Sequence, residues 1–184
     1  MNLFRGVLLF ALTLSSSFAS INHDLLKVES ALMPKVILMD YNYKKRVVNN
    51  SISFVVLYSS HNYVDAKKFK QLIENKYSSK LATYNLHVTL CSYNDFNNKP
   101  IQATAIYLLP TNSKDIKKSI AYAQKNSILT FSYSEDDLSY GALISVRVDK
   151  RVKPIINPNS LKSYNIEFRA VLLKISDIYK GDLK

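Results

Sequence analysis

The feature that most constrains the fold is an apolar run of β-branched and aromatic residues in the first half of the chain. Residues 52–58 read Ile-Ser-Phe-Val-Val-Leu-Tyr, with a single polar interruption. A strand with one face in water alternates apolar and polar residues, whereas a strand buried on both faces reads as a nearly continuous apolar run. Such strands are typical of parallel sheets that helices cover on both sides. The run therefore predicts α/β architecture.

Strand-like and helix-like segments alternate on both sides of this run. Further strands are expected over residues 84–90, 102–109 and 126–132. Helices are expected over residues 24–39, 64–77 and 114–125. The inward-facing residues of the last two helices are Phe69, Leu72, Ile73, Ile116, Ile120 and Ala123. This alternation predicts one three-layer domain with a mostly parallel sheet and helices on both faces.

Three shorter features modify this pattern. Pro34 lies inside the first expected helix, which should bend or restart there. Residues 40–50 are polar and basic, which favours a loop or a short edge hairpin. Residues 94–100 are rich in asparagine and indicate a turn.

The last third of the chain is expected to add an antiparallel edge to the sheet. An acidic turn at residues 134–137, which should face solvent, leads to strands over residues 141–148 and 152–156. Gly141 opens the first of these strands, which suggests a positive φ or a close backbone approach. Asn157 and Pro158 suit the start of a final amphipathic helix. Its inward face is expected to hold Ile166, Phe168, Val171, Leu172, Ile175 and Ile178.

The first residues have the pattern of a secretory signal peptide. Arg5 supplies positive charge, residues 6–14 are apolar, and residues 17–19 read Ser-Phe-Ala, a small-x-small cleavage signal. A membrane anchor is the less favoured alternative, because the run is well short of the roughly 20 residues that span a bilayer. We expect residues 1–19 to be a cleaved signal peptide and residues 20–184 to be a single periplasmic domain.

Charge and cysteine content narrow the class of partner. The net charge is +11, and it falls to +10 once Arg5 is removed. A basic surface favours phospholipid headgroups, acidic glycans or acidic proteins, although a lysine-rich solvated surface needs no partner at all. Export argues against nucleic acid. Cys91 is the only cysteine, so no intramolecular disulfide can form, and its position favours a small buried residue over a reactive thiol.

Signatures of catalysis and metal binding are absent from the sequence. It contains no glycine-rich phosphate loop and no GxSxG motif. The histidines are His23, His61 and His87, without the short spacing of a metal site. Acidic residues 135–137 are interpreted as a surface turn, and no motif places a base beside Ser59, Ser60 or Ser132. We therefore expect a protein that is not an enzyme, without catalytic residues, cofactor or metal; an envelope hydrolase remains a minor alternative.

Two surfaces are candidates for binding. Ligands of open α/β sheets bind outside the carboxyl ends of the strands. His61, Thr111, Tyr133 and Arg147 are expected near those ends, where they could line a polar cleft or be ordinary loop residues. The first helix could either dock on the sheet or offer a partner-binding face. The residues of that face are Met33, Val36, Ile37 and Met39.

The last third also carries a family resemblance. Residues 128–132 read Ile-Leu-Thr-Phe-Ser, Gly141 and Ala142 open a strand, and Ile156-Asn157 lead into a segment ending Phe-Arg-Ala-Val-Leu-Leu-Lys-Ile-Ser-Asp-Ile-Tyr. This pattern resembles the YfiR/HmsC-like periplasmic regulators, and it extends more weakly over residues 24–180. The resemblance implies an exported, non-catalytic repressor that binds the periplasmic region of an inner-membrane diguanylate cyclase and so controls cyclic di-GMP and biofilm formation.

The resemblance also implies partners, and the sequence departs from it in two places. An inner-membrane sensor, an outer-membrane lipoprotein that sequesters the regulator, and a second copy of the chain are the implied partners. Relatives use paired cysteines for redox-sensitive folding, which Cys91 alone cannot reproduce. An aromatic Trp-Pro ending after the first helix is replaced by Met39-Asp40-Tyr41. A small-ligand-binding module of a transport or sensory system remains the alternative function.

Overall fold

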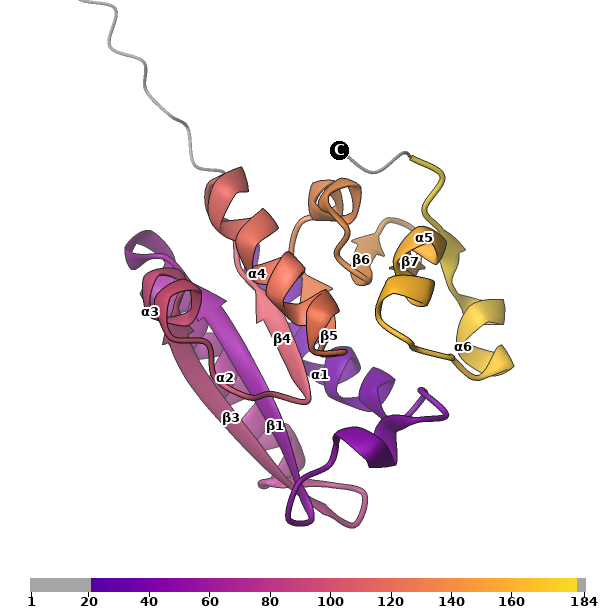
Figure 1. Ribbon diagram of the computed structural model, residues 1–184, viewed down its shortest axis with the longest axis horizontal. Coiled ribbons are helices and arrows are strands. Elements are labelled where there is room, and N and C mark those ends of the chain that lie inside the picture. Colours follow the sequence, from indigo (N-terminus) through magenta and orange to yellow (C-terminus); the bar gives the residue numbers. More distant parts are fainter. Residues whose placement is uncertain (1–20, 182–184) are drawn as a thin grey trace, which may run out of the picture.

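Eight strands form one sheet in the computed structural model, which describes residues 21–181 (Figure 1). The strand order is β2-β3-β1-β4-β5-β6-β7-β8. The strands are β1 (Ser51–Tyr58), β2 (Lys80–Leu81), β3 (Tyr84–Ser92), β4 (Ala105–Leu108), β5 (Leu129–Ser132), β6 (Ile144–Val148), β7 (Val152–Ile156) and β8 (Asp177–Ile178). The β2–β3 and β6–β7 pairs are antiparallel, and the other five pairs are parallel. The predicted α/β class with a mostly parallel sheet is confirmed.

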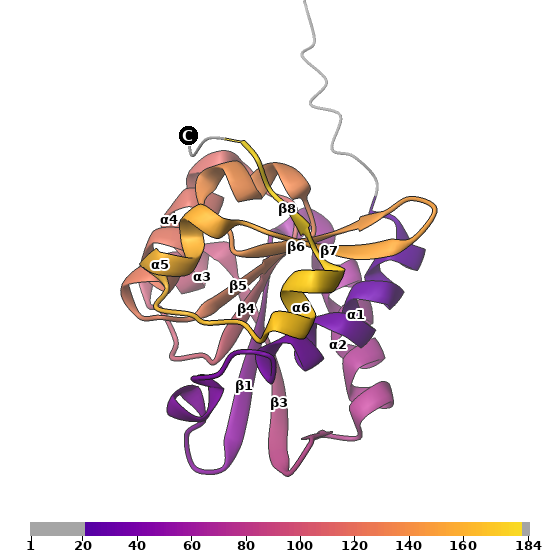
Figure 2. The same cartoon turned by 90° about the vertical axis from the view of Figure 1, so that its right-hand side faces the viewer.

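Helices cover both faces of this sheet. The α-helices are α1 (His23–Ile37), α2 (Tyr63–Tyr77), α3 (Tyr93–Asn98), α4 (Ser113–Lys125), α5 (Pro158–Ser163) and α6 (Ala170–Ile175). Three short 3₁₀ helices are η1 (Tyr43–Arg46), η2 (Ser60–Asn62) and η3 (Glu135–Tyr140). Figure 2 shows α3 and α4 on one side of the central strands, with α1 and α2 on the other. Among residues 21–181, no helix has the length and apolar character needed to cross a bilayer.

The core lies on the central strands, as the apolar run at residues 52–58 predicts. Every residue of β4 and β5 is buried. On the α1 and α2 side, Phe69 of α2 stacks on Tyr107 of β4 with ring centroids 4.1 Å apart. Phe54 of β1 stacks on Phe131 of β5 at 5.9 Å. Phe54 also packs against Phe69 at 6.5 Å, so these rings join β1, β4 and β5 to α2. Aromatic pairs add stability beyond the area that they bury.

The N-terminal half follows the predicted elements with two differences. Pro34 lies within α1 without ending it, so the expected restart does not occur. The prediction of a turn over the asparagine-rich residues 94–100 is wrong, because α3 occupies most of this segment. Ser92 caps α3 by accepting a hydrogen bond from the backbone N–H of Asp95, and Tyr93 and Phe96 are buried. Two buried aromatics three positions apart stabilise a helix whose other residues have poor helical propensity.

The prediction of one final amphipathic helix is wrong. Two short helices and a strand occupy this part of the chain. Asn165, with φ 50°, follows α5 and ends any helical continuation. The chain then runs extended, so that Phe168 pairs with Asp40, before α6 and β8 begin. Of the six residues expected to face inward, only Ile166, Phe168 and Leu172 are buried. Val171, Ile175 and Ile178 are exposed instead.

The segment before β6 confirms one expectation and corrects another. Gly141 has φ 98°, and a Cβ there would lie 2.8 Å from Gln124 Nε2, so both the positive φ and the close approach that were expected are present. The acidic turn does not face solvent throughout, because Asp137 is buried and accepts a hydrogen bond from the Ser132 hydroxyl. Burial raises the pKa of Asp137 to about 6, and the Ser132 hydrogen bond opposes that rise.

Candidate functional site

The strand order reverses direction beside β1, which marks one end of the sheet as a ligand site. The chain passes from β1 through α2 to β3 on one side of β1, and then through α3 to β4 on the other side. Crevices outside the carboxyl ends of strands at such a reversal are the usual ligand sites of open α/β sheets. The carboxyl ends of β1 and β4 are therefore the first place to look for a site.

A pocket of about 470 Å³ lies at this reversal, and we call it the switch-point pocket. It is lined by Tyr58, Ser59, Ser60, His61, Ser92, Tyr93, Asn94, Thr111, Asn112 and Asp115. The structure thus brings together His61 and Thr111, two of the four residues that the sequence placed at strand ends. His61 Nδ1 lies 3.2 Å from Ser60 Oγ, its neighbour in η2.

Buried side chains hold the walls of the switch-point pocket in place. Asn62 donates from Nδ2 to the carbonyl of Pro110 at 2.7 Å, and its Oδ1 accepts from the backbone N–H of Ser59 at 2.8 Å. Tyr93 donates its hydroxyl proton to the carbonyl of Leu109 at 2.6 Å. These bonds tie the end of β4 to the ends of both β1 and β3. Burial raises the pKa of Tyr93 well above its ordinary value, so the phenol stays a donor.

Tyr133 and Arg147 lie away from the switch-point pocket. The Tyr133 hydroxyl accepts a hydrogen bond from the backbone N–H of Asn22, just before α1, at 2.8 Å. Arg147 pairs with Glu135 and lies 3.6 Å from Asp177. The expectation of one cleft lined by all four residues is therefore wrong, because β5 and β6 carry these two side chains to other parts of the surface.

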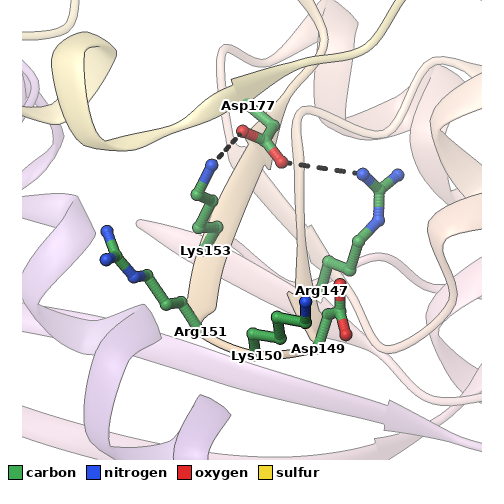
Figure 3. Close-up of a pocket in the computed structure, with 6 residues that line it drawn as sticks. All are labelled: Arg147, Asp149, Lys150, Arg151, Lys153 and Asp177. Atoms are coloured by element: carbon green, nitrogen blue, oxygen red, sulfur yellow. Dashed lines mark hydrogen bonds and ion pairs between the residues drawn. The ribbon is translucent and has the colours of Figure 1, made fainter.

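Arg147 instead belongs to a charged pocket on the β6–β7 hairpin (Figure 3). The pocket has a volume of about 330 Å³ and is lined by Arg147, Asp149, Lys150, Arg151, Lys153 and Asp177. Asp177 of β8 accepts from Lys153 Nζ at 2.9 Å and also faces Arg147, as Figure 3 shows. Arg147 therefore connects the hairpin to β8 and η3 through ion pairs within the protein.

The face of α1 that the sequence offered as a partner surface packs on the sheet. Met33, Val36 and Ile37 are 0–1% exposed, and Met39 is half-buried. The partner-binding interpretation of these residues is wrong, because a partner cannot reach side chains that already fill the core. The alternative, that this helix docks on the sheet, is what the structure shows.

Most of the exposed apolar side chains lie in the C-terminal segment. Their helical spacing in the sequence had predicted that several of them would face the core. Of ten large hydrophobic residues exposed within residues 21–181, six lie between residues 148 and 178. We call the four in α6 and β8 the C-terminal apolar surface: Val171, Leu173, Ile175 and Ile178. Val171 and Ile175 are 57% and 56% exposed and lie one helical turn apart.

No group of three or more His, Cys, Asp and Glu side chains within residues 21–181 is arranged to hold a metal ion. Of the three serines considered as nucleophiles, Ser132 donates to Asp137 and Ser59 donates to Asn62 Oδ1 at 3.2 Å. Ser60 Oγ lies 3.2 Å from His61 Nδ1. Cys91 is half-buried, and burial raises the pKa of its thiol, which lowers its reactivity.

A comparison with protein families shows which family this chain belongs to. A family model described as YfiR/HmsC-like matches residues 41–177, which is most of the described chain. The chain belongs to the YfiR/HmsC-like family. The resemblance drawn from the C-terminal third is confirmed, and the match covers strands β1 to β7 in full. This family is one of regulators and is not a known enzyme family.

Solved structures resemble this YfiR/HmsC-like chain in fold. A conserved domain protein from Vibrio cholerae O1 biovar El Tor aligns with TM-score 0.58 and 15% identity, over 84% of this chain and 60% of that one. An ABC domain in complex with L-Trp from Streptococcus pneumoniae aligns with TM-score 0.52 and 15% identity, over 79% and 60%. A ligand-free, open substrate-binding protein with adhesive properties from Clostridium difficile aligns with TM-score 0.53 and 13% identity, over 80% and 59%.

These likenesses concern the fold alone. The chain spans about three fifths of the length of each of the three solved structures. No curated protein gives a significant match.

Proposed function

We propose that this chain is an exported regulatory protein that acts by binding a protein partner in the periplasm. Family membership supports the regulatory role, and the N-terminal pattern, which lies outside the described residues, supports export. The observation that carries the proposal is the C-terminal apolar surface. Large apolar side chains exposed together on one short segment are typical of an interaction site.

Charge indicates what kind of partner this surface suits. Residues 144–181 contain eight lysines and arginines against three aspartates and glutamates. The segment with the exposed apolar side chains therefore also carries positive charge, from Lys150 and Arg151 in the β6–β7 hairpin and from Lys174 in α6. A partner with an apolar centre and an acidic rim would complement both, since complementary rim charges speed association and fix orientation.

The family resemblance names candidates for that partner. The periplasmic sensor region of an inner-membrane diguanylate cyclase is the proposed target, and an outer-membrane lipoprotein is the proposed competitor. Because Cys91 is the only cysteine, regulation here would proceed without an intramolecular disulfide. The chain would restrain the cyclase through contact alone.

Co-purification tests this proposal with a matched pair of charge substitutions. Ile175→Glu places a carboxylate in the C-terminal apolar surface, while Val64→Glu does so on α2, where Val64 is 75% exposed. A central interface residue contributes 2 kcal/mol or more, so Ile175→Glu should reduce recovery of a membrane-bound cyclase or sensor by at least about tenfold. Val64→Glu should recover it as the wild type does. Equal recovery by both variants would exclude this surface.

A small-ligand-binding module is the second candidate function. The switch-point pocket supports it, and a substrate-binding protein and an L-Trp-bound domain are among the structures with a similar fold. The two functions are compatible, because the pocket and the C-terminal apolar surface share no residue.

A further inference from the structure

The switch-point pocket contains none of the positive charge that dominates the rest of the chain. The sequence has 25 lysines and arginines, yet none is among the ten residues that line this pocket. Asp115 is the only acidic residue among them. A pocket without lysine or arginine in its lining is poorly suited to a phosphate or a carboxylate, which proteins usually bind with those two side chains.

Helix termini near the pocket do not supply the missing positive charge. The first turns of α3 and α4 reach the pocket, and free backbone N–H groups there would attract an anion. Ser92 Oγ already accepts from the backbone N–H of Asp95 at 3.0 Å. Asn112 Oδ1 accepts from the backbone N–H of Asp115, also at 3.0 Å. At each of these helix starts, a side chain of the protein therefore already accepts from one of the backbone N–H groups that an anion could use.

The single carboxylate does not call for a cation either. Asp115 accepts from Asn112 Nδ2 at 2.7 Å and from Asn97 Nδ2 at 3.3 Å. It also lies in the first turn of α4, where the helix dipole stabilises a negative charge. Its charge is thus compensated within the protein, although each carboxylate oxygen can accept one more hydrogen bond.

What the pocket offers is a set of neutral hydrogen-bonding groups beside an aromatic ring. The hydroxyls of Tyr58 and Thr111 make no hydrogen bond to any described residue, and each can both donate and accept. The ring of Tyr58 packs against Tyr63 at 5.2 Å, which fixes its orientation at the pocket rim. Asn94 adds an amide, and the pocket volume of about 470 Å³ admits one or two sugar rings.

We propose that the switch-point pocket binds an uncharged, hydroxyl-rich ligand of the sugar class. This inference rests on the small-ligand role given above as the second candidate function, and it is independent of the partner-binding role. Ligand hydroxyls pair with side chains that donate and accept, while the apolar face of a sugar ring covers the Tyr58 ring. Asn62 and Tyr93 already tie the strand ends to one another, so little ordering is needed when the ligand enters.

Titration of the mature chain with four probes separates the ligand classes. The probes are glucose, N-acetylglucosamine, glucose 6-phosphate and L-lysine, followed by protein-observed NMR. Glucose or N-acetylglucosamine should shift the amide signals of residues around Tyr58 and Thr111, with an affinity at least about tenfold above that for glucose 6-phosphate, whose phosphate meets no cation. Stronger binding of glucose 6-phosphate or L-lysine would overturn the proposed ligand class while leaving ligand binding in place. Binding of none of the four would overturn both.

Two conservative variants then test the named groups. Thr111→Val and Tyr58→Phe remove one hydroxyl each and keep the side-chain shape, and each should weaken sugar binding about three- to tenfold. Thr83→Val is the control, because Thr83 is exposed at the turn between β2 and β3, at the other end of the sheet. Unchanged affinity in both pocket variants, with their folded spectra retained, would show that the sugar binds elsewhere.

Discussion

Arg46→Ala should lower the free energy of unfolding by about 3–5 kcal/mol, because it leaves a buried carboxylate without its counter-charge. Arg46 pairs with Asp40, whose side chain is fully buried. The same guanidinium donates from Nε to the carbonyl of Ser127 at 2.8 Å and from Nη2 to the carbonyl of Asn165 at 3.0 Å. One side chain therefore joins the end of α1, the start of β5 and the C-terminal segment.

Asp40 extends the same connection, which explains why the loss should be large. Its Oδ1 accepts from the backbone N–H groups of Asn42 at 3.1 Å and Glu167 at 3.2 Å. Ser127 and Asn165 both have positive φ, so the carbonyls that Arg46 binds belong to strained positions that need support from their surroundings. Removing the guanidinium releases both of them at once.

Urea denaturation of Arg46→Ala beside two control variants measures this effect. Lys45→Ala removes the neighbouring exposed charge and should change stability by less than about 0.5 kcal/mol. Arg147→Ala breaks ion pairs that are exposed to solvent, and it should therefore destabilise the protein far less than Arg46→Ala. If Arg46→Ala were no worse than Arg147→Ala, the buried pair would not hold the two halves of the chain together.

Glu29→Gln should stabilise the protein at pH 8, because the neutral amide avoids the cost of burying a carboxyl that is ionised in the unfolded chain at this pH. Glu29 lies on the inner face of α1 and is fully buried. Its Oε2 accepts a hydrogen bond from the Tyr107 hydroxyl, but Oε1 has no partner among the described residues. Burial raises the pKa of Glu29 well above its ordinary value, and the Tyr107 hydrogen bond opposes that rise only in part.

The raised pKa of Glu29 determines how the stability of the wild type, relative to Glu29→Gln, should change with pH. A carboxyl whose pKa is higher in the folded state binds more protons there than in the unfolded chain, so its contribution to stability is complete below about pH 4.5. That contribution falls as the pH rises towards the folded pKa. The stability of the wild type relative to Glu29→Gln should therefore decline from pH 4.5 to pH 8 in parallel denaturation series. A constant difference across that range would show that Glu29 does not change its protonation on unfolding.

Sequence patterns predicted the centre of the sheet well because burial there depends on local composition. The aliphatic residues of β1 are buried, and so are Ile116, Ile120 and Ala123, which recur at helical spacing in α4. Position 141 was predictable for a similar reason, since glycine adopts a left-handed conformation at little cost.

The prediction for the C-terminal segment was wrong because the spacing of apolar residues does not show where a helix ends. Val171 and Ile175 recur at helical spacing after Phe168, yet Asn165 takes a left-handed conformation and the chain restarts as α6 with those side chains outward. The candidate site was half predictable: strand ends at His61 and Thr111 meet because β1 and β4 are neighbours. Tyr133 follows β5 and Arg147 lies in β6, and both strands are farther along the sheet.

The most direct test of the regulatory role is the cyclic di-GMP content of cells that lack this chain. Loss of the chain should raise cyclic di-GMP, and the wild-type chain should restore the original level. Ile175→Glu, exported to the same amount, should fail to restore it, whereas Val64→Glu should succeed. An unchanged cyclic di-GMP level on loss of the chain, or full restoration by Ile175→Glu, would contradict a regulator that acts through its C-terminal apolar surface.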